Sequence, residues 1–298
     1  MKWQGVLPAI TTPFKPDFSV DADLLVKQVD ALVRAGCTGI VALGSLGEGG
    51  SLSFDEKKAV LRLCREALAG RAPLVAGVAA LTTADAIHLA ELGADAGCEG
   101  LMVLPPYVYK GDWRETRAHF DAVIGATPLP CMLYNNPIAY GTDVLPEQMV
   151  DLALALPNLV AVKESSADVR RVTALRALLA DRLAIFVGVD DLILEGIQAG
   201  ATGWIAGLAD ALPAESVRLF DLAAAGRVTE ARAIYDWFMP LLRLDTVPKF
   251  VQLIKLVQQE TGLGSETVRP PRLPLEAPER EAVLDLVRYA LARRPSLG

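Results

Sequence analysis

Histidine and cysteine are scarce in this chain of 298 residues, and their scarcity limits the chemistry it can support. The two histidines, His88 and His119, fall in separate helix-like segments, so neither a histidine metal site nor a Ser-His-Asp triad is easily assembled. The four cysteines have no C-x-x-C or other metal-type spacing,. We therefore expect reduced thiols that serve as small core residues, no bound metal and no cofactor. Lysine, tyrosine and hydroxyl groups are left to carry any chemistry.

Long apolar runs and basic clusters are also missing. No segment approaches the roughly 18 consecutive apolar residues of a membrane-spanning helix, and the N-terminus lacks the pattern of a signal peptide. The net charge is −7, and no lysine-arginine cluster is interleaved with aromatic residues,. These features predict a cytoplasmic protein with neither a membrane nor a nucleic acid as its partner.

A short phrase, Ala-Gly-x-x-Gly followed by an apolar residue, occurs at 35–40, 96–101 and 199–204. Each copy follows a helical pattern and precedes an apolar run. The first glycine suits a helix end with positive φ, and the second suits a tight entry into a strand. The phrase therefore indicates a repeated helix-to-strand junction, which is typical of α/β folds.

Eight short apolar runs, separated by segments of helical periodicity, predict eight strands. They lie at 5–10, 39–43, 73–78, 100–104, 130–134, 159–163, 183–187 and 203–205. Eight β-α units in one chain predict an α/β fold of the (β/α)₈ (TIM) barrel type, here over residues 1–225. A doubly wound sheet is the alternative, but no G-x-G-x-x-G follows the first run.

The remainder, residues 226–298, shows no further strand pattern, and we expect a C-terminal helical extension. Its amphipathic segments lie at 228–244, 248–261 and 278–293, and a proline-rich link at 269–274 separates the last two. The apolar stripe of the first segment suits packing on the barrel, although an oligomer surface would use the same residues.

Lys163 closes the apolar run 159–163, a place where lysine is least expected, whereas the other eight lysines fall in segments that we interpret as polar helices or loops. A buried ammonium group is costly and is usually paired or deprotonated. A neutral lysine is a nucleophile that forms a Schiff base with a carbonyl substrate. The alternative is a strand-end lysine that reaches solvent or pairs with Glu164.

Other candidate residues also follow strands, at the end of a barrel where active sites form. Tyr134 ends the fifth strand beside Lys163 and is placed to relay protons, unless it only packs at the barrel mouth. The glycine-rich segment 44–50 follows the second strand, and its N–H groups, with the Ser45 hydroxyl, suit a carboxylate. Asp190 and Asp191 follow the seventh strand and either bind substrate hydroxyls or cap the next helix.

Four motifs together resemble the dihydrodipicolinate synthase/N-acetylneuraminate lyase superfamily. They are G-S-L-G-E at 44–48, Y-N-N-P at 134–137, V-K-E-S at 162–165 and G-V-D-D at 188–191. The resemblance spans essentially the whole chain and implies a homotetrameric class I lyase that acts on a small 2-oxo acid. It assigns Schiff-base formation to Lys163 and proton transfer to Tyr134. It places substrate binding at Ser45, Leu46, Gly44, Gly47, Ile205, Gly188 and Asp190.

Three departures from the synthase pattern argue against dihydrodipicolinate synthase itself. Leu46 and Val108 stand where the synthase has relay hydroxyls, and Ala139 stands where it has an arginine for a dicarboxylate,. In the synthase, the second of these hydroxyls belongs to a tyrosine of a neighbouring subunit, and Tyr107 matches the tyrosine before it. Whether Tyr107 or Tyr109 reaches a neighbouring subunit's site stays open.

Longer strings, at 134–143, 235–242 and 269–273, are similar to the branch that deaminates 1-pyrroline-4-hydroxy-2-carboxylate to 2-oxoglutarate semialdehyde and ammonia. This cyclic imine is the substrate we predict. A 2-keto-3-deoxy-acid aldolase or an N-acetylneuraminate-type lyase is the alternative, followed by dihydrodipicolinate synthase and then by a non-catalytic 2-oxo-acid sensor.

Overall fold

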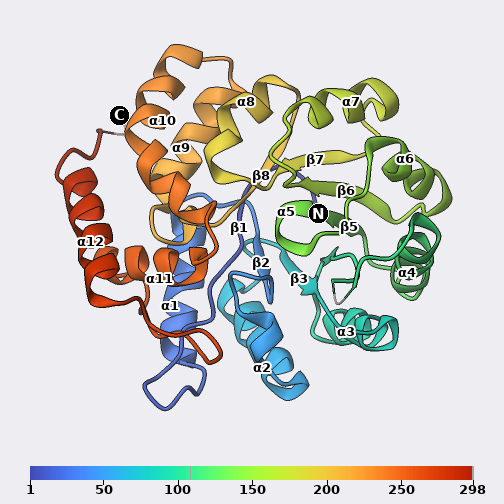
Figure 1. Cartoon of the computed structure of the whole chain (residues 1–298), viewed down its shortest axis with the longest axis horizontal. Coiled ribbons are helices and arrows are strands. Elements are labelled where there is room, and N and C mark those ends of the chain that lie inside the picture. The colour runs from blue at the N-terminus through green and yellow to red at the C-terminus, as the bar shows by residue number, and fades with distance from the viewer. Residues whose placement is uncertain (108, 297–298) are drawn as a thin grey trace.

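The computed structural model describes residues 1–107 and 109–296, in which eight parallel strands form a barrel surrounded by helices (Figure 1). The strands are β1 (Gly5–Pro8), β2 (Ile40–Ala42), β3 (Leu74–Val78), β4 (Gly100–Val103), β5 (Cys131–Asn135), β6 (Leu159–Glu164), β7 (Ala184–Val187) and β8 (Gly203–Ala206). Their order is β1-β8-β7-β6-β5-β4-β3-β2, and a bridge between Ala9 and Val41 joins the two ends. The predicted (β/α)₈ barrel is confirmed, and all eight strands lie in the predicted runs to within a few residues.

The barrel helices alternate with the strands. They are α1 (Ala22–Arg34), α2 (Phe54–Leu68), α3 (Thr83–Asp95), α4 (Trp113–Gly125), α5 (Pro137–Tyr140), α6 (Pro146–Ala155), α7 (Arg170–Leu179), α8 (Ile193–Gln198) and α9 (Pro213–Ala224). Local sequence explains several of their boundaries. Ser53 and Glu56 form a capping box at the start of α2,. The repeated phrase places Gly36, Gly97 and Gly200 after helices with φ of 96°, 77° and 108°, as the sequence predicts,.

Two apolar cores are separated by the sheet. The inner core fills the barrel and includes Met132, Tyr134, Ala161 and Ile205. The outer core lies between the strands and the helices, and all four cysteines are buried. Desolvation raises the pKa of the Cys131 thiol to about 12, as expected of a thiol that serves in packing,.

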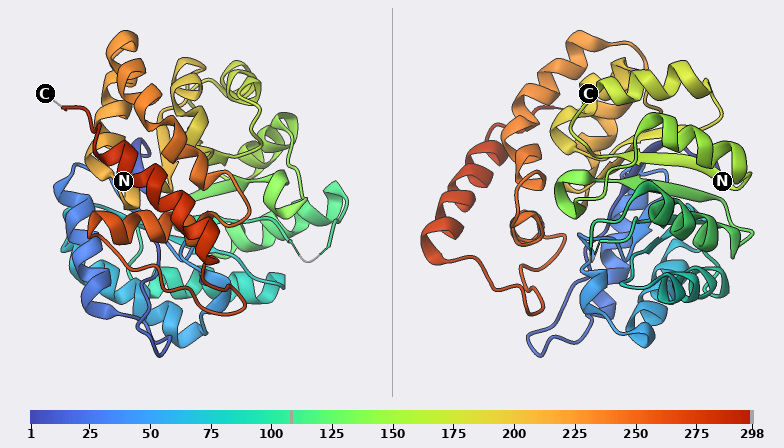
Figure 2. Two further views of the ribbon diagram at one scale, coloured as in Figure 1. Left: turned by 60° about the vertical axis from the view of Figure 1, so that its left-hand side comes forward. Right: turned by 45° about the vertical axis from the view of Figure 1, so that its right-hand side comes forward.

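The C-terminal extension contains α10 (Val228–Leu242), the short 3₁₀ segment η4 (Arg243–Asp245), α11 (Phe250–Thr261) and α12 (Ala277–Leu291). Figure 2 shows these helices stacked along one side of the barrel. Ile234, Phe238 and Leu241 of α10 are buried within the chain, so core packing is confirmed for this stripe. The division at residue 225 stays a prediction. Within the described ranges, no helix is both long enough and apolar enough to cross a membrane.

Candidate active site

Lys163 and Tyr134 occupy paired positions on β6 and β5. Below them, Ala161 and Met132 are likewise paired and belong to the inner core, so the alternation of side chains turns Lys163 and Tyr134 into the barrel,. The lysine Nζ lies 4.0 Å from the centroid of the tyrosine ring. The sequence-based expectation that these two side chains are neighbours is therefore confirmed.

Burial controls the protonation of this pair. Desolvation lowers the pKa of Lys163, against the opposing charges of Asp245, Tyr140 and Asp190. Desolvation also raises the pKa of the Tyr134 phenol, which accepts a hydrogen bond of 3.1 Å from Asn136 Nδ2. The nucleophilic free base of Lys163 is therefore more populated than that of an ordinary lysine, and the Tyr134 phenol holds its proton more strongly than an ordinary tyrosine.

Glu164 is not the partner of Lys163. It follows the lysine on β6 and therefore points to the opposite side of the sheet. There its carboxylate accepts hydrogen bonds from Asn135 Nδ2 at 3.2 Å and from the backbone N–H of Ser166 at 2.6 Å. Among the residues that the structure describes, Lys163 forms no ion pair. The alternative of a strand-end Lys163–Glu164 pair is wrong.

Gly188, directly after β7, makes room for the lysine. A Cβ at this position would lie 2.5 Å from Lys163 Cε and 2.0 Å from Ser165 Oγ, so any larger residue would displace one of them. The Ser165 hydroxyl is buried and forms no hydrogen bond within the described chain, although it lies near enough to Tyr134 to lower the pKa of that phenol. A polar group without a partner therefore lies beside the reactive amine.

The glycine-rich loop after β2 offers donors for an anion. The backbone N–H groups of Ser45, Leu46 and Gly47 donate no hydrogen bond to any described residue. The Leu46 side chain is buried in the outer core, so only its main chain can face a ligand. Gly47 is held in place because the Thr12 hydroxyl donates to its carbonyl at 2.7 Å. Unpaired N–H groups and the Ser45 hydroxyl together suit a carboxylate.

Tyr140 is a site residue that the sequence analysis missed. It ends α5, and its hydroxyl shares a hydrogen bond with Ser45 Oγ. Its ring meets that of Tyr134 edge to face, with centroids 5.7 Å apart. Desolvation raises the pKa of Tyr140, and the neighbouring Tyr134 charge raises it further. Its only signal in the sequence is the spacing Y-N-N-P-I-A-Y, which places it one helical turn beyond the proline.

The structure shows where most of the residues that depart from the synthase pattern lie. Ala139 is exposed on α5 and carries no charge toward the pocket. Val108 lies outside the described residues. Tyr107 is partly buried with its ring 5.9 Å from that of Tyr140, whereas Tyr109 is mostly exposed. Tyr107 is therefore the one of the two that lies beside the site.

Asp190 is buried, and both of its carboxylate oxygens accept hydrogen bonds from within the chain. It accepts hydrogen bonds from Trp204 Nε1 at 2.9 Å and from the backbone N–H groups of Gly207 and Leu208 at 3.2 and 2.8 Å. These bonds fix the loop that follows β8, so a contact between Asp190 and substrate stays a prediction that this geometry does not favour. Ile205, by contrast, lies inside the barrel as expected.

Asp245 is a second residue that the sequence analysis missed. It belongs to η4, between α10 and α11, and its carboxyl group lies against the backbone of Gly207 just beyond β8. Among charged groups it has the largest effect on the pKa of Lys163. The C-terminal extension therefore contributes a carboxyl group to the mouth of the barrel.

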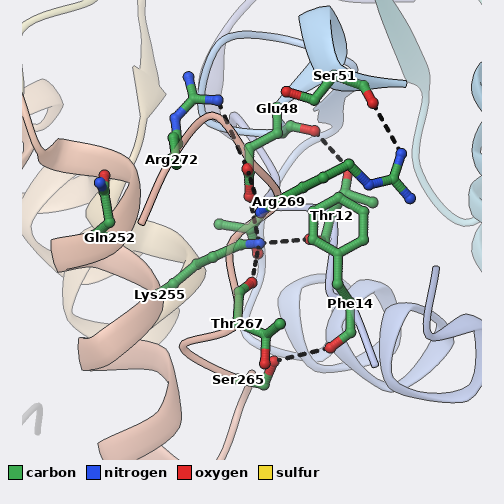
Figure 3. Close-up of polar contacts among 12 residues, drawn as sticks. Thr12, Phe14, Glu48, Ser51, Gln252, Lys255, Ser265, Thr267, Arg269 and Arg272 are labelled. Atoms are coloured by element: carbon green, nitrogen blue, oxygen red, sulfur yellow. Dashed lines mark hydrogen bonds and ion pairs between the residues drawn. The ribbon is translucent and has the colours of Figure 1, made fainter. Parts of the chain in front are cut away.

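The expectation that all lysines except Lys163 lie in polar surroundings is wrong for Lys255. This residue of α11 is fully buried, and its Nζ contacts Glu48 Oε1 at 2.6 Å and donates to the carbonyls of Thr12 and Thr267 at 2.8 Å each (Figure 3). Arg269 adds a backbone N–H bond to Glu48 Oε2 at 3.1 Å. Because Glu48 directly follows Gly47, this cluster ties the extension to the anion-binding loop.

Comparisons with known proteins agree with this geometry. A model of the dihydrodipicolinate synthetase family matches residues 2–290. A 4-hydroxy-tetrahydrodipicolinate synthase from Xanthomonas axonopodis is 35% identical over 299 residues, which covers 98% of this chain and 96% of that protein. Another, from Methanothrix thermoacetophila, is 32% identical over 283 residues, 95% of each chain.

Solved structures show the same fold. The 4-hydroxy-tetrahydrodipicolinate synthase of Methylacidiphilum fumariolicum has a TM-score of 0.92 and 28% identity, and the match covers 98% of both chains. An E. coli prophage protein of the dihydrodipicolinic acid synthase family, in complex with pyruvate, has a TM-score of 0.92 and 26% identity over 98% of this chain and 99% of that one.

Proposed function

This chain belongs to the dihydrodipicolinate synthetase family, a family of class I Schiff-base lyases, and we propose that it deaminates 1-pyrroline-4-hydroxy-2-carboxylate to 2-oxoglutarate semialdehyde. One observation carries the choice of substrate. The site keeps the amine and the phenol, but the position that would bind a second carboxylate is the exposed Ala139. The ionisable groups around Lys163 instead include the carboxyls of Asp245 and Asp190. Such a site suits a substrate with one carboxylate and one hydroxyl.

Binding would begin at the loop after β2. The substrate carboxylate would accept hydrogen bonds from the free N–H groups of Ser45, Leu46 and Gly47, with Gly44 giving the loop its turn. This placement presents the imine carbon, C2, to Lys163 Nζ. The bound pyruvate of the E. coli prophage protein supports a small 2-oxo acid or its imine as ligand.

Lys163 would then attack C2, and the ring nitrogen would leave as the C5 amine, so that a Schiff base replaces the cyclic imine. Tyr134 is placed to carry the proton between the two nitrogens, and the Tyr140–Ser45 hydrogen bond extends this path toward the carboxylate loop,. Loss of a C3 proton gives an enamine, and loss of the C4 hydroxyl as water gives a conjugated imine. Proton shifts and hydrolysis of both C–N bonds release ammonia and 2-oxoglutarate semialdehyde.

Dihydrodipicolinate synthase is the second candidate, because the curated relatives bear the name 4-hydroxy-tetrahydrodipicolinate synthase. Two features support the deaminase instead: Ala139 is exposed, and the Leu46 side chain is buried in the outer core, between the strands and the helices. A 2-keto-3-deoxy-acid aldolase and an N-acetylneuraminate-type lyase would use the same lysine and tyrosine. A non-catalytic sensor is least favoured.

A homotetramer in the cytoplasm is also part of this proposal. Ile138 on α5 and Leu154 on α6 are large apolar residues with 73% and 74% of their surface exposed, which suits contact with another subunit,. Analytical ultracentrifugation would report the mass in solution, and a monomer at micromolar concentration would contradict this part.

The substrate is tested by supplying 1-pyrroline-4-hydroxy-2-carboxylate and measuring ammonia with a coupled glutamate dehydrogenase assay. In parallel, pyruvate with aspartate semialdehyde tests the synthase, and a 2-keto-3-deoxysugar acid tests the aldolase. We expect ammonia release with the pyrroline and background rates with the other two. Synthase or aldolase turnover without ammonia release would overturn the deaminase proposal and leave the Schiff-base chemistry standing.

A further inference from the structure

Among the described residues, Asp245 is the one carboxyl group near Lys163 that makes no hydrogen bond or ion pair. Its neighbours are engaged: Asp190 accepts three hydrogen bonds, and Asp210 accepts one from the backbone N–H of Thr11 at 3.1 Å. In the described part of the chain, no hydrogen bond or ion pair reaches Asp245, and the residue is partly exposed. A carboxyl held in place without a partner is available to a ligand.

The backbone around Asp245 is shaped to hold it at the barrel mouth. A Cβ on Gly207 would lie 2.2 Å from Asp245 Oδ1, so a larger residue at that position would displace the carboxyl group. The Gly207 N–H is in turn fixed by Asp190, and η4 packs on the turn that contains Asp190 and Asp191. Asp245 is therefore positioned over the ends of β7 and β8.

The ends of β7 and β8 are separate from the carboxylate loop after β2, because β1 lies between β8 and β2 in the strand order. A substrate bound by its carboxylate at Ser45–Gly47 and by its C2 at Lys163 directs C3, C4 and C5 away from that loop. The unpartnered Ser165 hydroxyl, beside Lys163 and Gly188, lies on the β6–β7 side of the lysine. A polar ligand group on this side would satisfy it. The site therefore offers two free polar groups where the hydroxyl end of the substrate would lie.

We propose that Asp245 is a catalytic residue that protonates the C4 hydroxyl as it leaves, with Ser165 as a hydrogen-bond donor or acceptor to the same substrate. This inference rests on the proposed function. In the step, the enamine electrons form the C3=C4 bond, the C4–O bond breaks, and the Asp245 carboxyl proton joins the departing oxygen to give water. The lysine enamine becomes the iminium again, and the Asp245 carboxylate recovers a proton from solvent.

The environment of Asp245 suits an acid. Desolvation and the nearby Asp190 charge raise the pKa of Asp245 well above its ordinary value, while the Lys163 charge lowers it. A carboxyl with a raised pKa keeps its proton to higher pH than an ordinary aspartate and can give it to a leaving hydroxyl, as general acids do.

The test compares Asp245→Asn with the matched surface variant Asp236→Asn, which alters an exposed aspartate of α10 in the same extension. Two reactions are followed. Exchange of the pyruvate C3 hydrogens in D₂O, seen by NMR, needs only the Schiff base and its enamine. Ammonia release from 1-pyrroline-4-hydroxy-2-carboxylate needs loss of the hydroxyl as well.

We expect Asp245→Asn to exchange pyruvate hydrogens within about threefold of wild type at its own optimum pH and to release ammonia roughly 10²- to 10⁴-fold more slowly, the usual range for general acid catalysis. Asp236→Asn should match wild type in both. As a second variant, Asp245→Ala should regain ammonia release when formate is added. Equal loss in both reactions, or unchanged ammonia release, would overturn the role of Asp245. If wild type exchanges pyruvate hydrogens but releases no ammonia, the proposed substrate fails, and the role of Asp245 fails with it.

Discussion

The Nζ of Lys163 lies 4.0 Å from the ring centroid of Tyr134, and the two residues are paired across β6 and β5. The contact of the amine with the ring face does not depend on the phenolic hydroxyl, whereas proton transfer does. Tyr134→Phe should therefore keep the fold and the lysine position but lower kcat roughly 10²- to 10⁴-fold. Steady-state kinetics with a thermal melt would check this, and a variant with wild-type kcat would contradict the role of Tyr134.

Tyr140 and Ser45 are predicted to act as one unit, because their hydrogen bond extends the proton path that starts at Tyr134. Tyr140→Phe and Ser45→Ala each break the same bond, so the double variant should lose little more activity than the worse single variant. Non-additivity of this kind marks residues that act together. If the two losses in activation free energy simply add, the hydrogen bond is not part of the proton path.

Gly188→Ala is predicted to displace the reactive amine. The added Cβ would lie 2.5 Å from Lys163 Cε and 2.0 Å from Ser165 Oγ. Both side chains would therefore have to move to relieve the overlap. Activity should fall by at least tenfold with a modest loss of stability, roughly 1–3 kcal/mol by analogy with overpacked cores. Gly125→Ala at the end of α4 is the control, because no atom of the described residues lies within 4 Å of the added Cβ. Equal activity of the two variants would contradict this packing.

The pH dependence of pyruvate hydrogen exchange follows from the amine. Burial lowers the pKa of Lys163 below the ordinary 10.5. The free base reacts, and its fraction increases with pH through that pKa, so the rate should rise and level off below pH 10.5. The Asp245 charge raises the pKa of Lys163, so Asp245→Asn should move the rise to lower pH. A move to higher pH would contradict this electrostatic assignment.

Lys255→Met should destabilise the fold. It leaves Glu48 buried without its 2.6 Å partner, and removal of one member of a buried pair costs about 3–5 kcal/mol,. Lys249→Met breaks the exposed pair with Glu279 and should cost about 0–1 kcal/mol,. Urea unfolding of both variants measures the difference. Equal free energies of unfolding would show that the buried cluster contributes nothing particular to stability.

The sequence predicted most of the fold, because the barrel repeats one local pattern. Eight apolar runs and three Ala-Gly junctions each indicated an element without any knowledge of its distant contacts. Lys163 and Tyr134 were found for the same reason: each ends a strand, and strand ends of a barrel meet at one face.

The residues that were missed depend on long-range packing. Asp245 follows the barrel in the chain and reaches the site only because η4 packs against the turn at Asp190–Leu192, after β7, and lies against Gly207, after β8. The residues near Lys255 in the sequence predict a surface lysine, because its buried partner, Glu48, is 207 residues away in the chain. Tyr140 depends on the turn that Asn136 makes when it caps α5 by accepting from the Ala139 N–H at 3.0 Å. Local periodicity carries no information about such contacts.

The most direct test of the central claim is borohydride reduction in the presence of pyruvate, followed by peptide mass mapping of wild type, Lys163→Ala and the exposed-lysine control Lys27→Ala. We predict one reduced pyruvate adduct on Lys163 in wild type and Lys27→Ala, and none in a folded Lys163→Ala. An adduct that persists in Lys163→Ala, or no adduct in wild type, would contradict a Schiff base at Lys163.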